Sequence, residues 1–321
     1  MHVPPEIAAL RSDRAPQREA QTAMKRALEL WLAESAVAQV RRDLVAYGAG
    51  ESLAECAGLQ SVFATSGRAE AILASLTAHF CAELRDNPMG HPPFRAGFDG
   101  VVGSIQLVRS GTAHLSLHAR EPGKFAATAH RFSDCQRHEA VVGGSARARI
   151  VRRLEAGGGT RFAVQRLALR QGSRLSLDLA REALQFSSVS TRLVVLRLSR
   201  QRSDPRPSRE YDAATGKLLH QSAGDLATSR LEASIALLGR MGRKDAARPI
   251  AHIARGHGDT SLRWQALREC LALDTAEGFA ALRTLASDAA DPLAAPAGAL
   301  RAQLLEMHPE LAQLEAMRCR A

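Results

Sequence analysis

The stretch that decides the fold is HRFSDCQRHEAVVGGSARARIVRRLEAGGGTRFAVQRLALRQGSRLSLDLA at residues 130–180, continued by TRLVVLRLSR at residues 191–200. It has the pattern of several short strands in succession. Turn signals separate these strands at Gly143-Gly144-Ser145, at Gly157-Gly158-Gly159 and at Gln171-Gly172-Ser173. Their spacing is typical of an antiparallel sandwich or barrel.

Two helical patterns and a hairpin precede this stretch. Apolar residues recur at helical intervals from Gln17 to about Tyr47, and again over residues 68–84. The dipeptide Ser110-Gly111 then separates two segments with strand character, which predicts a hairpin. We therefore expect an N-terminal helical segment at residues 1–95, followed by a β-domain at residues 96–222.

The composition changes after residues 222–224, where we place a domain boundary. From residue 225 to residue 321 the chain is rich in Ala and Leu and has helical periodicity. Leu231, Leu262 and Leu293 recur every 31 residues, each near the start of a predicted helix. A period of this size in paired helices predicts an α-solenoid of about three helix pairs, with each of these leucines pointing inward.

One of these helices resembles a known repeat. Residues 259–271, DTSLRWQALRECL, resemble the first helix of a HEAT-type repeat, which has an aspartate, an aliphatic-arginine pair, then alanine and leucine. In the following repeat Ala294 stands at the arginine position. The resemblance covers about the last hundred residues and implies a contact surface rather than a reaction. Arg263 and Trp264 are its candidates for binding a protein partner.

A second resemblance covers about residues 96–200. HEAVVGGSARARIV at residues 138–151 resembles a cupin strand pair, and residues 169–178 are similar to a later cupin turn and strand. The family's His-x-His pair is absent, and no histidine occurs from residue 139 to residue 219. The resemblance implies an α+β fold with a central cupin-type barrel that has lost its usual metal site.

The net charge of +10 comes almost entirely from arginine. Guanidinium groups suit phosphate, so nucleic acid is one partner to consider. The arginines are scattered along the chain, however, and Phe162 is the only aromatic residue between Phe132 and Phe186. This pattern favours a compositional bias with arginine spread over solvated surfaces.

The remaining composition indicates a cytoplasmic protein. The five cysteines form no CxxC pair, and their odd number argues against a disulfide framework. The N-terminal residues lack the apolar run of a signal peptide, and no window has ~18 consecutive apolar residues. We therefore expect no membrane association.

Histidines between residues 91 and 138 are the candidates for a ligand or metal site. His114 and His118 share one face of a predicted strand but lie ~13 Å apart along it, too far to bind one ion together. Either of them would need His130 or His138 from a neighbouring strand. Glu139 follows His138 directly, and adjacent strand residues point to opposite faces, so the two are not expected to pair.

The sequence favours a non-enzymatic binding or sensing module, with no catalytic residues, metal or cofactor assigned. It would act through a protein partner or a small ligand. The alternatives are a metal-binding cupin-type enzyme that uses the histidines of residues 91–138, and a basic protein associated with nucleic acid.

Overall fold

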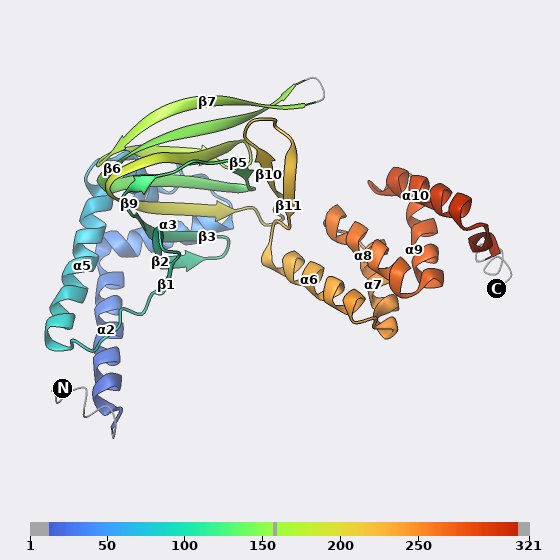
Figure 1. Ribbon diagram of the computed structural model, residues 1–321. Coiled ribbons are helices and arrows are strands. Elements are labelled where there is room, and N and C mark those ends of the chain that lie inside the picture. Colours follow the sequence, from blue (N-terminus) through green and yellow to red (C-terminus); the bar gives the residue numbers. More distant parts are fainter. Residues whose placement is uncertain (1–12, 157–158, 314–321) are drawn as a thin grey trace, which may run out of the picture. The chain divides into compact units, whose positions relative to one another are not determined.

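The computed structural model describes residues 13–156 and 159–313 (Figure 1). They divide into two compact units. The first contains the described residues up to Ser203, together with Glu210–Leu219, and the second contains Asp204–Arg209 and the described residues from His220 onward. None of the helices in these ranges has the length and hydropathy needed to cross a bilayer.

The first unit begins with a layer of helices. Their bounds are α2 (Ala15–Ala33), α3 (Ser35–Ala49), α4 (Ala57–Ala64) and α5 (Arg68–Asp86). Met24 and Trp31 of α2 lie seven residues apart on its buried face, as the helical period requires. The predicted helix over Gln17–Tyr47 is two helices, because the chain turns at Glu34, whose backbone is extended.

The strands follow these helices in the chain. Their bounds are β1 (Arg95–Phe98), β2 (Val102–Ser110), β3 (Ala113–Arg120), β4 (Gly123–Lys124), β5 (Ala129–Phe132), β6 (Cys135–Ala156), β7 (Gly159–Arg170), β8 (Arg174–Asp178), β9 (Glu182–Gln201), β10 (Ser208–Asp212) and β11 (Leu218–Ser222).

These strands form two sheets. The large sheet has the order β1-β2-β3-β9-β6-β7, with β4 added to β9 and β8 added to β6, and these strands pair antiparallel. The small sheet has the order β11-β10-β5. The predicted antiparallel strands are confirmed, as is the hairpin at Ser110-Gly111.

Gly143, Gly144 and Ser145 do not form the predicted turn. They lie within β6, which continues through them, and the register against β9 shifts several times between Val141 and Ala148. Gly144 has φ +81, and a Cβ placed there would lie 2.1 Å from the carbonyl oxygen of Arg192. The glycines therefore allow a bulged, bent strand. In the predicted turn at 157–159, Gly157 and Gly158 lie outside the described residues.

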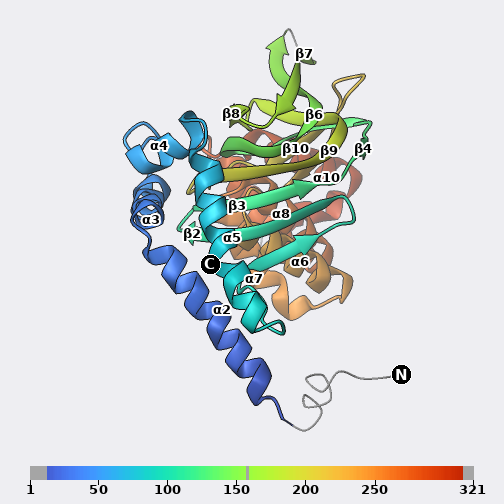
Figure 2. The same cartoon turned by 90° about the vertical axis from the view of Figure 1, so that its left-hand side faces the viewer.

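One face of the large sheet packs against the helices (Figure 2). Leu115, Leu196 and Leu198 are buried in the same core as Trp31 and Tyr47. Arg200 joins the two layers at one end. Its guanidinium lies 4.0 Å from the centre of the Tyr47 ring and donates to the carbonyl oxygens of Tyr47 and Glu51. The end of α3 and the turn that follows it are thereby held on β9.

The second unit is helical. Its bounds are α6 (Leu226–Arg240), α7 (Ala247–Arg255), α8 (Thr260–Leu273), α9 (Thr275–Ser287) and α10 (Ala294–Met307), with short 3₁₀ turns at Lys244–Ala246 and Pro309–Leu311. Helix α8 packs against α6, α7 and α9, and α9 packs against α10. The predicted cap at Asp259 is confirmed, because its side chain accepts the N–H of Leu262.

The leucines of the 31-residue spacing are not equivalent. Leu262 and Leu293 are buried, whereas the side chain of Leu231 is 44% exposed. The buried residue of α6 is Ile235, which lies one turn further on. The prediction that Leu231 points inward is therefore wrong. The equal spacing of the three leucines does not determine which face of α6 packs against the other helices.

The bend in β6 should depend on Gly144 and not on Gly143. Gly144→Ala places a methyl group against the Arg192 carbonyl at a left-handed φ, so we expect it to lower the free energy of unfolding by about 2 kcal/mol or more. Gly143→Ala meets nothing within 4 Å and is the matched control, expected to cost less than about 1 kcal/mol. Urea unfolding of both variants measures the difference, and equal losses would contradict this account.

In the second unit, Leu262→Ala should destabilise far more than Leu231→Ala. Leu262 lies within the apolar core, so its truncation leaves a cavity and should cost on the order of 2–5 kcal/mol. The half-exposed Leu231 should cost less than about 1 kcal/mol. Thermal denaturation of the two variants tests the ordering, and a larger loss for Leu231 would show that α6 packs by its other face.

Candidate functional site

Polar side chains lie in one row across four strands of the large sheet. Gln106 of β2 pairs with Ser116 of β3, which pairs with Arg197 of β9, which pairs with Glu139 of β6. Directly paired residues of antiparallel strands project to the same side of a sheet. Leu196 and Leu198, the neighbours of Arg197, project into the helix-side core. The row therefore lies on the opposite side, which we call the polar face.

A buried ionic cluster occupies this face. Glu139 is only 1% exposed, and its Oε1 accepts hydrogen bonds from Nε and Nη2 of Arg197 at 2.8 and 2.7 Å. Nη1 of Arg137 lies 4.0 Å from the same oxygen. Nε of Arg137 is buried and has no hydrogen-bond partner among the described residues. The cluster thus holds two guanidinium groups for one carboxylate.

Two histidines lie beside the cluster. Burial lowers the pKa of His118 to about 3, and Arg197 and Arg137 add to this effect. Burial, followed by Arg109 and Arg197, also lowers the pKa of His114. Both rings are therefore neutral at pH 7 and serve as hydrogen-bonding groups rather than as cations.

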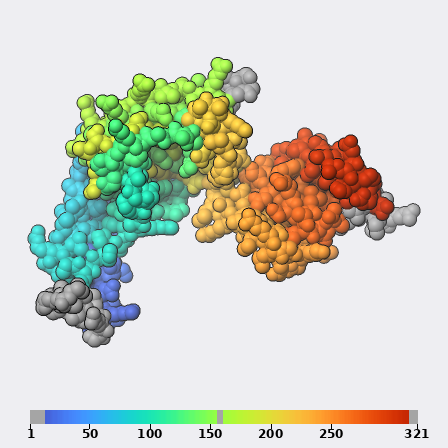
Figure 3. Space-filling view, viewed as in Figure 1, coloured from blue at the N-terminus to red at the C-terminus, as the bar shows by residue number. Residues whose placement is uncertain are grey.

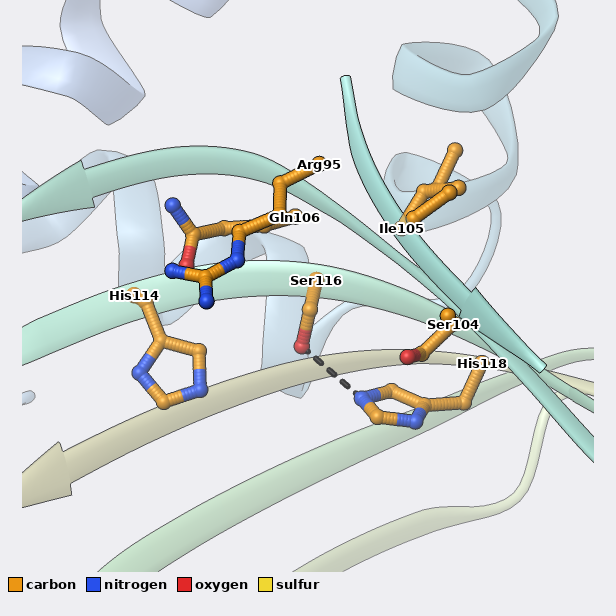
Figure 4. Close-up of a pocket in the computed structure, with 9 residues that line it drawn as sticks. Arg95, Ser104, Ile105, Gln106, His114, Ser116 and His118 are labelled. Carbon is orange, nitrogen blue, oxygen red and sulfur yellow. Dashed lines mark hydrogen bonds between the residues drawn. The ribbon is translucent and has the colours of Figure 1, made fainter. Parts of the chain in front are cut away.

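His114 and His118 line a cavity of about 270 Å³ over β1, β2 and β3, and the cluster of Arg137, Glu139 and Arg197 lies next to these histidines on the adjoining strands β9 and β6. The lining of the cavity includes Arg95 of β1 and Gln106 of β2, together with His114, Ser116 and His118, which project from alternate positions of β3 to the same side (Figure 4). Ser116 Oγ and His118 Nε2 share a hydrogen bond of 2.9 Å. The guanidinium of Arg95, a hydroxyl, an amide and neutral imidazoles are groups that bind an anion.

The other histidine candidates lie elsewhere. His138 is on the helix side of the sheet, with its ring 6.2 Å from that of Tyr47 and 6.3 Å from that of Phe63. His130 lies on β5 against Phe162, with ring centres 4.5 Å apart. The structure therefore brings His114, His118 and Glu139 to one face and separates them from His130 and His138.

The residues of the polar face do not fit the metal that a cupin would hold. Within the described ranges, no three His, Cys, Asp or Glu side chains come close enough to share an ion. The carboxylate of Glu139 is already bound by Arg197. The guanidinium groups of Arg137 and Arg197 depress the pKa of both imidazoles and repel a divalent cation in the same way.

Sequence reasoning missed Arg137, Arg197 and Ser116. Arg197 stands between Leu196 and Leu198 in TRLVVLRLSR, so period-2 alternation does place it opposite the core. What the sequence does not give is the register, which sets Arg197 opposite Glu139, 58 residues away.

The candidates in the second unit have different environments. Arg263 is buried, and its Nε donates to the carbonyl oxygen of Ala254 at 3.1 Å, while its Nη2 donates to Asp291. The Arg263 guanidinium is thus bound by groups of the helical unit itself. The Trp264 ring is partly buried against the same core.

Parts of the chain are similar to solved structures, at low TM-scores. Vicilin from Solanum melongena is 15% identical over 37% of this chain and 32% of its own, with a TM-score of 0.29. The capsular polysaccharide assembling protein CapF from Staphylococcus aureus is 10% identical over 40% of this chain and 34% of its own, with a TM-score of 0.28. A cupin superfamily protein from Desulfitobacterium hafniense is 14% identical over 33% of this chain and 83% of its own, with a TM-score of 0.24.

The aligned part thus spans about a third of the vicilin and CapF chains. No protein-family model and no curated protein matches the chain. The structural neighbours of this mixed helix and antiparallel-sheet protein therefore include a cupin superfamily protein, and we draw no function from a similarity of this extent.

Proposed function

We propose that the protein is a binding module that holds a small organic anion on the polar face of its large sheet. The observation that carries this proposal is the excess of buried positive charge. Arg197 binds Glu139. Among the described residues, the buried Nε of Arg137 has no hydrogen-bond partner, and Glu139 supplies the only carboxylate within 4 Å of its guanidinium.

A buried cation without its own counter-charge lowers the stability of the folded state, so folding alone gives no reason for it. Removing a charge from water costs several kcal/mol unless a counter-charge and hydrogen bonds replace the lost hydration. An apolar residue at position 137 would avoid that cost. A ligand carboxylate that reaches Arg137 supplies the missing partner, and the desolvation already present makes the guanidinium a stronger anion receptor.

The surrounding groups set the size and polarity of the ligand. At about 270 Å³, the cavity is smaller than most sites for drug-sized molecules, which enclose ~300–1,000 Å³. The neutral rings of His114 and His118, the Ser116 hydroxyl and the Gln106 amide can bind hydroxyl or carboxyl groups of such a ligand. A hydroxylated di- or tricarboxylic acid has the matching charge and size.

This proposal includes the wider architecture expected from the sequence. The sheet would be a cupin-type domain without a metal, and the second unit a short HEAT-like array that contacts a protein partner in the cytoplasm. The bond from Arg263 of α8 to Asp291, just before α10, supports the array, because it links helices of successive repeats.

Arg137→Gln is the variant that tests the anion site. It removes the excess cation and leaves the bond between Glu139 and Arg197 in place. Calorimetric titration with malate and citrate should show binding to the wild type and a loss of about tenfold or more in the variant, which corresponds to ~1.4 kcal/mol. The free energy of unfolding should stay equal or rise, because a buried unpaired charge is removed.

Arg147→Gln is the matched control, since Arg147 is an exposed arginine on the same strand. It should bind both acids as the wild type does. The proposal fails if the wild type binds neither acid, or if Arg137→Gln binds them as tightly as Arg147→Gln does.

The depressed pKa of His118 also makes a prediction about acid stability. An unfolded histidine titrates near ~6.5, and His118 in the folded protein near about 3, so the folded state binds fewer protons between these values. The stability that this ring contributes is complete above pH ~6.5 and is lost as the pH falls toward about 3. Between about pH 6 and about pH 4, the unfolding free energy of His118→Gln should therefore fall less steeply than that of the wild type. The two slopes should differ by at most about 1.4 kcal/mol per pH unit. Urea unfolding at several pH values measures this slope, and identical slopes would contradict a buried neutral ring.

A further inference from the structure

A second cavity lies at the other end of the first unit, away from the polar face. It measures about 450 Å³ and is bounded by β5, β6, β7 and the turn between β10 and β11. In the space-filling view, the gold atoms of that turn lie against the green atoms of the sheet (Figure 3). The lining residues are His130, Arg149, Thr160, Arg161, Phe162, Val164 and those of the turn at 213–216.

The turn forms a fixed wall of this cavity. Gly216 has φ +71, and a Cβ placed there would lie 2.3 Å from the carbonyl oxygen of Thr160. Only glycine allows the turn to approach β7 this closely. Asp212 holds the turn from inside, because its Oδ1 accepts the N–H groups of Ala214 and Thr215 and the hydroxyl of Thr215. The carboxylate of Asp212 is thereby engaged within the turn.

His130 has a ring N–H for which the described residues supply no acceptor. Its side chain is buried, with 3% exposure. Gln185 accepts the Nε hydrogen of Arg149 through Oε1, and its Nε2 donates to the Ala129 carbonyl and lies 2.9 Å from Nδ1 of His130. The amide nitrogen has only hydrogens to offer, so Nδ1 is the acceptor and the neutral ring carries its proton on Nε2. Within the described residues, no hydrogen-bond partner of that Nε2–H is found.

The ring of His130 is held in this orientation. It packs edge-on against Phe162 at 4.5 Å, and Phe162 in turn stacks on Phe132. Burial, followed by Arg149, lowers the pKa of His130, so the neutral form persists at pH 7. Phe162 thus packs against His130, Phe132 and Tyr211, and we assign its ring to the support of the histidine.

Among the described residues, the charged side chains that line the cavity are those of Arg149 and Arg161. The Asp212 carboxylate, held inside the turn, is close enough to oppose in part the lowering of the His130 pKa that burial and Arg149 cause. Arg149 commits its Nε to Gln185 and keeps its two terminal amino groups for other partners. Together with the hydroxyl of Thr160 and the Nε2–H of His130, these groups give the cavity hydrogen-bond donors from β5, β6 and β7.

We propose that this cavity binds the phosphate group of a small phosphate ester. A tetrahedral phosphate offers three terminal oxygens to donors that come from several directions, whereas a planar carboxylate offers two in one plane. Guanidinium, imidazole N–H and hydroxyl donors on β5, β6 and β7 match the phosphate. This site is independent of the organic-anion site on the polar face, because it shares no residue with it.

Titration of the full-length protein with inorganic phosphate and glucose 6-phosphate, followed by calorimetry and by ³¹P NMR, tests this site. The wild type should bind glucose 6-phosphate with a Kd below about 1 mM and should not bind glucose. His130→Phe keeps the aromatic packing and removes the donor, and Arg149→Met removes the cation. Each should weaken binding about tenfold or more.

Two controls separate this site from other arginines. Arg166→Met changes the residue paired with Arg149 across the β6–β7 hairpin, which does not line the cavity. Arg137→Gln removes the cation of the polar face. Both should bind glucose 6-phosphate as the wild type does. Circular dichroism checks the fold of each variant, and Arg149→Met still tests the site if His130→Phe does not fold. Absence of binding to the wild type, or equal weakening by Arg149→Met and Arg166→Met, would overturn the proposal.

Discussion

The antiparallel pairing of β6 with β9 is the interaction on which the rest of the first unit depends. The two strands are 22 and 20 residues long, β3 and β4 pair with β9, and β7 and β8 pair with β6. A pair of this length has to bend, and the register shifts around Gly144 supply the bend. The bend separates the part of β6 that lies against α4 and α5 from the part that pairs with β7. Arg137 and Glu139 lie on the first part, and Arg149, which lines the second cavity, lies on the other.

The same strands carry the core and the charged cluster on opposite faces. Leu196 and Leu198 join the helix-side core, and Arg197 between them binds Glu139. Burial of the leucines holds β9 against β6 whether or not the polar face is favourable. Val141 and Val195, which project to the same side as Glu139 and Arg197, are buried in a second apolar cluster. Apolar burial on both sides of the strand pair therefore allows the sheet to carry an excess cation at Arg137.

The sequence predicted element types well and their pairing poorly. Alternation and the Ser110-Gly111 turn located the β2–β3 hairpin, and Asp259 marked the start of α8, because these signals are local. Gly143, Gly144 and Ser145 were misread as a turn. Glycine serves a bulge and a turn equally well, and only the approach of Arg192 distinguishes the two. The exposure of Leu231 was missed for the same reason, since it depends on which helices pack against α6.

The candidate site shows why counting residue types is a weak guide to function. Five histidines within residues 91–138 are candidates for a ligand or metal site by residue type, yet strand parity places His138 and Glu139 on opposite faces of one strand. The arginine excess suggested compositional bias, and a net charge of +10 over the whole chain cannot distinguish bias from function. The ratio of guanidinium groups to carboxylates inside a buried cluster can distinguish bias from function. On the surface, an extra guanidinium costs almost nothing because water solvates it, whereas two guanidinium groups around one buried Glu139 carry a cost that composition does not explain. The local balance of buried charge is therefore the quantity that points to a ligand.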